Sequence, residues 1–260
     1  MIARVLKSLS LCGLLVFSFG ARAQAQTGDL ALQISGHGPV VVLESGLGAP
    51  QSNWSSVVPP LARCLTVVTY DRRGIGESPP RSDPFAPVLA EDVANDLSDA
   101  LRAYGLRGPY LLVGHSIGGL YVQAFARAHP ERVSGMVLVD ASSPLEPPGV
   151  FVSSAASPRG SIEAAEEAGV AASVARLMSG PPLPPMPLVV LAAANHGDAA
   201  EREELWRDVQ RRTAALSPNG RFELVESRHF IQIDRPEVVV AAVLDVASRG
   251  GVNTSDCKSG

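Results

Sequence analysis

The chain has 260 residues, of which 46% are hydrophobic and 18% are charged, and its formal net charge is -4. This much apolar material excludes a disordered or fibrous protein, and the length suits one large α/β domain. No run of Lys or Arg occurs, so we expect no nucleic-acid partner, because phosphate backbones are bound by basic surfaces. An anionic membrane surface is disfavoured as a partner for the same reason, since it too would be bound by basic residues.

The first stretch of the chain has the pattern of a secretory signal peptide. Arg4 and Lys7 precede an apolar run over 9–19, which an Ala-Arg-Ala site follows. A basic segment, a short apolar segment and an A-x-A site are typical of a cleaved export signal. The run is too short for a membrane anchor, which needs about 20 apolar residues. We therefore expect cleavage that removes residues 1–23, with Ala25 as the alternative position, and a secreted or periplasmic protein without stable membrane insertion.

From Leu30 onward, apolar runs of strand length alternate with helical patterns, which is typical of α/β architecture. Several runs are continuously apolar, so we expect strands covered on both faces and a mostly parallel sheet. The first two runs, separated by a Gly-His-Gly-Pro sequence, are expected to form a hairpin. The strand candidates are 30–34, 40–43, 66–70, 110–113, 136–139, 188–193 and 222–225.

Helical patterns lie between these runs. They cover 93–104, 117–128, 161–178, 205–216 and 237–246, the last opened by Pro236 at a favoured first-turn position. Between Asp140 and Leu188 no strand is indicated, and an insertion of this size predicts a small lid over about 141–187. The Gly/Ser/Asn-rich segment 249–260 is expected to be a flexible tail.

The sharpest local signal is the G-x-S-x-G sequence Gly114-His115-Ser116-Ile117-Gly118. It lies between an apolar run and an amphipathic helix, which is the strand–turn–helix context of a nucleophile elbow. The turn holds Ser116 in a strained backbone, and the Ile117 N–H at the helix start can face a developing oxyanion. We predict Ser116 as a nucleophile, with a structural Gly-rich turn as the alternative. A P-loop is excluded because no Gly-Lys-Ser/Thr follows.

A nucleophilic serine needs a general base, and the chain has five histidines. His229 follows the last strand candidate, where a loop at the carboxyl edge of the sheet can face the serine. We predict His229 as the base; the alternative is a surface histidine with a structural role. His115 lies inside the elbow, with its side chain expected to point away from the serine, while His37 and His129 lie in turn-like contexts.

These motifs together resemble the α/β-hydrolase superfamily. The elbow and the late histidine are accompanied by the turn Tyr70-Asp71-Arg72-Arg73-Gly74-Ile75-Gly76-Glu77-Ser78 and by Glu44-Ser45-Gly46-Leu47-Gly48, in the order that the superfamily has. The resemblance covers about Leu30 to Ala247 and is closest to small, single-domain, esterase-like members. It implies an α/β-hydrolase domain over 24–248, with a mostly parallel eight-stranded sheet, helices on both faces and a cap inserted after the sixth strand.

The resemblance also implies an oxyanion hole. Its first donor in such proteins is the N–H after a His-Gly pair, and here Ser45-Gly46 stands in that place, which assigns the donor to Leu47. The second donor is Ile117. The departure from His changes little in the chemistry, because a backbone N–H is the donor. Asp71 and Arg72 match a turn that we interpret as structural.

The acid of the triad is ambiguous in the sequence. The superfamily places it after either the sixth or the seventh strand. Asp140 ends an apolar run, where its carboxylate can reach the ring N–H of His229 and hold the tautomer. After the next strand the candidate is Asp198, within Asn195-His196-Gly197-Asp198. We favour Asp140 and keep Asp198 as the alternative; the structural interpretation of Asp140 is a strand-end cap.

Two cysteines, Cys64 and Cys257, remain after signal removal. An even pair in an oxidising compartment favours a disulfide, whereas two unrelated thiols are the alternative. Analogy with the fold adds an argument, because Cys64 follows a helix that packs beside the final helix in such hydrolases. Pairing would then attach the tail to the body of the domain.

We therefore predict an exported serine hydrolase that cleaves an ester or a related acyl compound through Ser116, His229 and Asp140. Its partner would be a small acyl substrate, and we expect no metal and no organic cofactor, since no metal or dinucleotide motif occurs. Carbon–carbon bond hydrolases and acyltransferases use the same triad and stay open. A ligand-binding homologue without catalysis is the alternative of a different class. Substrate identity and oligomeric state are left open.

Overall fold

The computed structural model describes residues 30–151 and 157–258 of the chain. The predicted signal segment 1–23 lies outside these residues. Within the described ranges, no helix combines the length and the apolar character that a membrane span requires.

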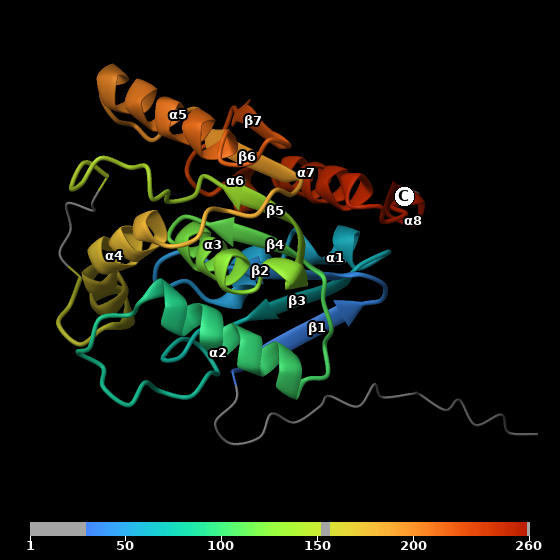
Figure 1. Cartoon of the computed structure of the whole chain (residues 1–260), viewed down its shortest axis with the longest axis horizontal. Coiled ribbons are helices and arrows are strands. Elements are labelled where there is room, and N and C mark those ends of the chain that lie inside the picture. Colours follow the sequence, from blue (N-terminus) through green and yellow to red (C-terminus); the bar gives the residue numbers. More distant parts are fainter. Residues whose placement is uncertain (1–29, 152–156, 259–260) are drawn as a thin grey trace, which may run out of the picture.

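A single twisted sheet forms the centre of the molecule (Figure 1). Its strand order is β1-β3-β2-β4-β5-β6-β7, and every neighbouring pair is parallel except β1 with β3. The described residues thus contain seven strands, where eight were expected. The strands are β1 (Leu32–Gly36), β2 (Val40–Glu44), β3 (Thr66–Tyr70), β4 (Tyr110–His115), β5 (Val133–Val139), β6 (Leu188–Ala193) and β7 (Gly220–Val225).

The expected hairpin of the first two strands is wrong, because β3 lies between β1 and β2. Strand β1 runs antiparallel to β3, with Leu32 opposite Tyr70. The burial pattern explains this placement. Strand β2 is almost fully buried and has β3 and β4 as its neighbours, whereas β1 is mostly exposed and suits only an edge of the sheet.

Helices are present at all five predicted patterns, and three further short helices, at 58–61, 231–234 and 255–258, were not predicted. They are α1 (Val58–Leu61), α2 (Ala90–Ala103), α3 (Gly118–Ala128), α4 (Ile162–Ser179), α5 (Ala200–Ala214), α6 (Ile231–Asp234), α7 (Pro236–Arg249) and α8 (Ser255–Lys258), with 3₁₀ turns η1 (Gln51–Trp54) and η2 (Pro130–Arg132). Pro236 occupies the first turn of α7, where its missing N–H has no partner to lose.

The strands divide the core into two layers because successive side chains point to opposite faces. In β4, Leu112 packs in the cluster that includes Phe125 of α3 and Leu101 of α2. Its neighbour Val113 packs in the other cluster, with Val243 of α7. The sheet is therefore covered by helices on both faces, as its continuously apolar strands predicted.

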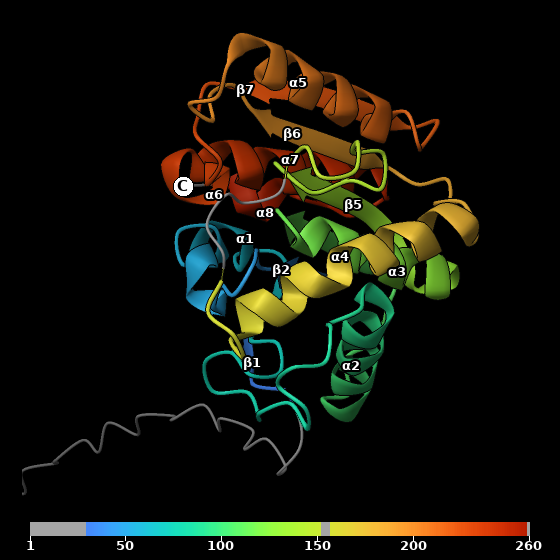
Figure 2. The same cartoon turned by 90° about the vertical axis from the view of Figure 1, so that its left-hand side faces the viewer.

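The long segment between β5 and β6 contains α4, which contacts α2 and α3 (Figure 2). The Val88 N–H donates to the Ala165 carbonyl at 2.8 Å, and the Ala90 N–H donates to Ser173 Oγ at 2.9 Å. These bonds attach α4 to the beginning of α2. A lid function for this segment stays a prediction.

The end of the chain is attached to the domain by a disulfide. Cys64 and Cys257 are bonded, with their Cα atoms 5.3 Å apart and 193 positions apart in the sequence. Both side chains are buried. Part of the segment expected as a flexible tail, the short helix α8, is thereby joined to the chain just after α1.

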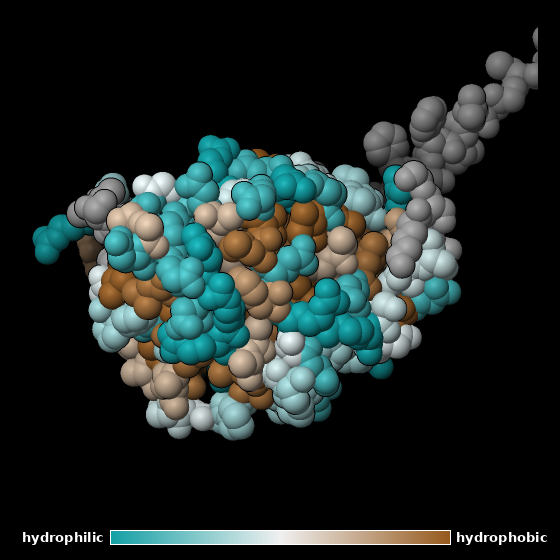
Figure 3. All heavy atoms as spheres, turned by 90° about the horizontal axis from the view of Figure 1, so that it is seen from above, coloured by the Kyte–Doolittle hydropathy of each residue, from teal (hydrophilic) through white to brown (hydrophobic). Residues whose placement is uncertain are grey.

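Strand β7 forms the edge of the sheet opposite β1, and most of its residues are partly or fully exposed. Leu224 on this strand is 41% exposed. Figure 3 shows the molecule from above the view of Figure 1. On this face, apolar residues gather near the middle and polar residues surround them.

Candidate active site

Ser116 lies in the tight turn between β4 and α3. Its φ of 53° falls in the left-handed region, which non-glycine residues rarely adopt. The Ser116 carbonyl stabilises the turn, because it accepts hydrogen bonds from the N–H groups of Gly119 and Ser142, both at 2.9 Å. The glycines around it are required by close packing, because a Cβ on Gly118 would lie 2.6 Å from the Ser45 carbonyl oxygen.

The loop that carries Leu47 lies against the serine turn. A Cβ on Gly46 would be 3.2 Å from Ser116 Cβ and 2.8 Å from His115 Nδ1, so only glycine fits there. Among the described residues, neither the Leu47 N–H nor the Ile117 N–H donates a hydrogen bond. Within this part of the chain, both predicted oxyanion donors thus lack a protein acceptor.

Asp140 follows β5 and is completely buried, with a φ of 42°. Its Oδ2 is 2.6 Å from His229 Nδ1. Its Oδ1 accepts hydrogen bonds from the Ala193 N–H at 2.9 Å and from Trp206 Nε1 at 2.8 Å. Burial by itself would raise the pKa of Asp140, but the hydrogen bonds from His196 and His229 outweigh it and hold the pKa well below its usual range.

Asp198, the alternative acid, is placed differently. Its carboxylate pairs with Arg202, one turn further along at the start of α5, at 2.9 Å. It belongs to a partly exposed ion pair rather than to the contacts of His229. Of the two candidates, only Asp140 therefore contacts the histidine that follows β7.

His196 is a member of this cluster that the sequence did not single out for a role. Its Nε2 is 2.7 Å from Asp140 Oδ2, and its Nδ1 is 2.9 Å from Glu203 Oε2. Burial lowers the pKa of His196, but the contacts with Asp140 and Glu203 outweigh this and raise it to about 9. The one available signal was its position directly after a parallel strand, where ligands and catalytic groups gather.

His115 contacts the loop that carries His229. Its side chain is buried, and its Nε2 lies 3.1 Å from the His229 carbonyl oxygen, which makes Nε2 the donor. The two rings are 4.7 Å apart, and Phe230 is 5.3 Å from each. Burial, reinforced by the nearby His229, lowers the pKa of His115 to about 3, so this ring is neutral.

A buried ionic cluster lies beneath the loop of Leu47. Arg72 is 2.6 Å from Glu44 at the end of β2 and 2.6 Å from Glu166 on α4, and Glu166 also accepts the Gly48 N–H at 2.8 Å. Burial raises the pKa of Glu44 to about 7 against the attraction of Arg72. Asp71 is buried as well and accepts the Gln51 N–H at 2.8 Å. Asp71 and Arg72, which we interpreted as structural, are thus both buried.

Asp140, His196 and His229 are also the residue types that bind metals, and their candidate ligand atoms lie within 4.8 Å of one another. However, Asp140 Oδ2 is only 2.6 and 2.7 Å from the two ring nitrogens. Two ligands on one tetrahedral zinc ion, each bound at about 2.1 Å, would be separated by more than about 3 Å. The distances therefore fit shared protons and do not fit a shared ion.

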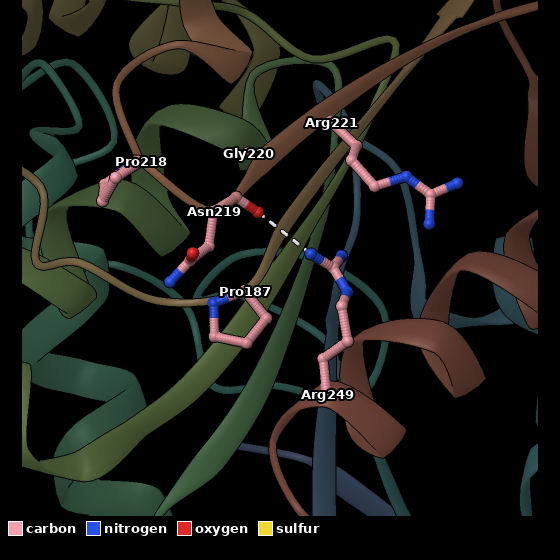
Figure 4. A pocket seen from close by; sticks show the side chains of 6 residues that line it. All are labelled: Pro187, Pro218, Asn219, Gly220, Arg221 and Arg249. Carbon is pink, nitrogen blue, oxygen red and sulfur yellow. Dashed lines mark hydrogen bonds between the residues drawn. The ribbon is translucent and has the colours of Figure 1, made fainter.

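Two surface hollows lie away from this cluster. One, of about 410 Å³, is lined by Pro187, Pro218, Asn219, Gly220, Arg221 and Arg249 (Figure 4). The other, of about 380 Å³, lies between β7 and α7. The first is at the amino ends of β6 and β7, whereas Ser116 and Asp140 follow the carboxyl ends of their strands. Ligands of parallel sheets bind at the carboxyl ends of the strands. The first hollow therefore lies at the opposite end of the sheet from Ser116 and Asp140.

A family model described as the alpha/beta hydrolase fold matches residues 39–201. The chain belongs to the alpha/beta-hydrolase family. Membership agrees with the order of the elbow, Asp140 and His229 along the chain, and it supports hydrolytic activity.

Three proteins from the comparisons show how similar this chain is to known sequences and structures. "Uncharacterized protein YqjL" of Bacillus subtilis (strain 168) is 28% identical over 217 residues, which cover 80% of this chain and 83% of that protein. The "Putative carbamate hydrolase RutD" of Caulobacter segnis is 38% identical over 108 residues, but these cover only 42% of this chain and 40% of that protein. A solved thermophilic esterase from Thermogutta terrifontis is 22% identical, with a TM-score of 0.64 and coverage of 85% and 93%, which shows the shared fold.

Proposed function

We propose that this protein is an exported serine hydrolase that cleaves an ester or a related acyl compound. Ser116 is the nucleophile, His229 the general base and Asp140 the acid that orients it. Two observations carry the proposal: the 2.6 Å contact between Asp140 Oδ2 and His229 Nδ1, and the strained turn that holds Ser116. This contact makes Nδ1 the protonated nitrogen and leaves Nε2 free to accept a proton.

The proposed reaction has two stages. His229 Nε2 takes the hydroxyl proton as Ser116 Oγ attacks the carbonyl carbon, and the negative oxygen is bound by the N–H groups of Leu47 and Ile117. The alcohol then leaves with the proton of His229, and water releases the acyl group by the same steps. Ser116 Oγ makes no hydrogen bond within the described residues, so the approach of His229 Nε2 to the serine is part of the proposal. Such contacts often tighten only with substrate.

Labelling with a fluorophosphonate probe tests the activated serine directly, because the probe reacts only with an activated hydroxyl. We expect Ser116 to be labelled, and Ser116→Ala to abolish labelling and to lower hydrolysis on the order of 10³-fold or more. His229→Ala should also prevent labelling. Near-full hydrolysis by Ser116→Ala would reject the mechanism, and a wild type that is never labelled would favour a ligand-binding protein.

The substrate class needs a panel of compounds. p-Nitrophenyl esters of increasing chain length, run beside lactones, carbamates and amides, separate the acyl chemistries that the names of similar proteins suggest. We expect the highest kcat/KM with esters. The exposed side chains of Phe230 and Ile233, beside and just after His229, favour a compound with an apolar group.

Export is part of the proposal. The pattern over 1–23 supports it, and so does the disulfide between Cys64 and Cys257, because disulfides persist in oxidising compartments.

A further inference from the structure

The contacts of His196 require that its ring carries a positive charge. Both ring nitrogens face carboxylate oxygens, with Nε2 at 2.7 Å from Asp140 and Nδ1 at 2.9 Å from Glu203. A neutral imidazole has one N–H and one lone pair, so one of these contacts would set a lone pair against a carboxylate. With both nitrogens protonated, the ring donates to both carboxylates, and each contact becomes a charge-assisted hydrogen bond.

This cation shares its acceptor atom with the proposed general base. His229 Nδ1 and His196 Nε2 both contact Asp140 Oδ2, and the two rings are 6.1 Å apart. Asp140 is fully buried and also accepts two further hydrogen bonds on Oδ1, so its orientation is determined by all four donors. A charge on His196 therefore reduces the negative charge that His229 experiences from Asp140.

We propose that His196 is a positioning residue of the active site, whose positive charge, maintained by Glu203, fixes Asp140 and opposes protonation of His229. This inference rests on the proposed role of His229 as the general base. Its consequence is that loss of the His196 charge should make protonation of His229 easier, because His229 then faces the full negative charge of Asp140.

The other groups around His196 do not cancel this effect. Trp206 of α5 packs edge-on against the ring at 5.5 Å and has no charge. Asp198 and Arg202 are paired with each other at 2.9 Å. Glu146, in the segment after β5, is half-buried near Asp140, and burial raises its pKa to about 7. The facing charges are thus the carboxylates of Asp140 and Glu203, the imidazole of His229 and the titrating Glu146.

A histidine titration by NMR tests the proposal without any substrate. The full chain, labelled with ¹⁵N-histidine, is titrated from about pH 5 to about pH 10, a range that covers histidine ionisation. We expect the His196 ring to lose its proton near pH 9 in the wild type. In His196→Gln, whose amide can still donate to Asp140 without a charge, the midpoint for His229 should rise by about one pH unit. His37→Gln, the same change at an exposed histidine, is the control and should leave His229 unchanged.

Each outcome of the titration is decisive. A neutral His196 ring at pH 7 in the wild type, or an unchanged or lower midpoint for His229 in His196→Gln, would overturn the proposal. Where His196→Gln does not fold, Glu203→Gln tests the same relation, because it removes one of the two carboxylates. In that variant His196 should lose its proton at a lower pH than in the wild type, and an unchanged titration would again overturn the proposal.

The pH dependence of fluorophosphonate labelling separates this inference from the proposed function. On the acid limb, His196→Gln should be labelled about tenfold more slowly than the wild type, since one pH unit is a factor of ten in the free base. The ratio of the wild-type rate to the variant rate should fall as the pH rises, whereas a purely structural defect would lower labelling by the same factor at every pH and would overturn the inference. A wild type that is not labelled at any pH rejects the hydrolase, while the NMR titration still decides the charge of His196.

Discussion

At the scale of single residues, the site depends on which carboxylate meets His229. Asp140 is buried and accepts four hydrogen bonds, whereas Asp198 forms a partly exposed pair with Arg202. Replacement of Asp140 by Asn presents an amide to His229 and favours the wrong tautomer, so we expect kcat to fall on the order of 10³- to 10⁴-fold. Asp198→Asn, the matched control, should change kcat less than about threefold, because exposed ion pairs contribute little. Steady-state kinetics with the best ester of the panel checks both, and the reverse ranking would make Asp198 the acid.

At the scale of elements, α4 is connected to the loop of Leu47 by Glu166. The Glu166 carboxylate accepts hydrogen bonds from the Arg72 side chain and from the Gly48 N–H. It thereby joins α4 to the turn after β3 and to the loop that carries Leu47. Glu166→Gln leaves the buried arginine with one fewer charged partner, and we expect a loss of about 3 kcal/mol in the free energy of unfolding. Glu167→Gln, one position along the same helix and only half-buried, should stay within about 0.5 kcal/mol of the wild type. Urea unfolding of both variants at pH 7 makes the comparison, and equal losses would show that Glu166 has no special role.

At the scale of the whole molecule, the disulfide closes a loop of most of the domain. In the chain-entropy model a loop of this length stabilises by about 5 kcal/mol, so Cys257→Ser should lose up to that amount in the free energy of unfolding. A reducing agent should destabilise the wild type and leave Cys257→Ser unaffected. Intact-mass analysis of exported material should find no free thiol and an N-terminus after residue 23 or 25. Two free thiols in that material, or a reducing agent without effect, would contradict this prediction.

The local motifs of the sequence were sufficient for the fold class and the serine turn. The G-x-S-x-G sequence between an apolar run and a helix predicts where Ser116 lies, because the strain and the close packing of such a turn are properties of adjacent residues. The continuous apolar runs predict a buried, mostly parallel sheet for a similar reason. A strand that is covered on both faces needs apolar side chains at successive positions, and this pattern is local to the strand. The resemblance to the α/β-hydrolase superfamily rests on several such motifs in a fixed order.

Tertiary structure decided the contacts between distant segments. The sequence could not place β1 beside β3, because two adjacent apolar runs are compatible with a hairpin until the burial of β2 on both sides is known. It left Asp140 and Asp198 open, since both follow strands that end at the same edge of the sheet. It also assigned no role to His196, whose charge depends on Asp140, 56 positions away, and on Glu203 at the start of a helix. Local patterns determine which elements form, whereas the distances of a few ångströms that control proton positions arise only when those elements pack together.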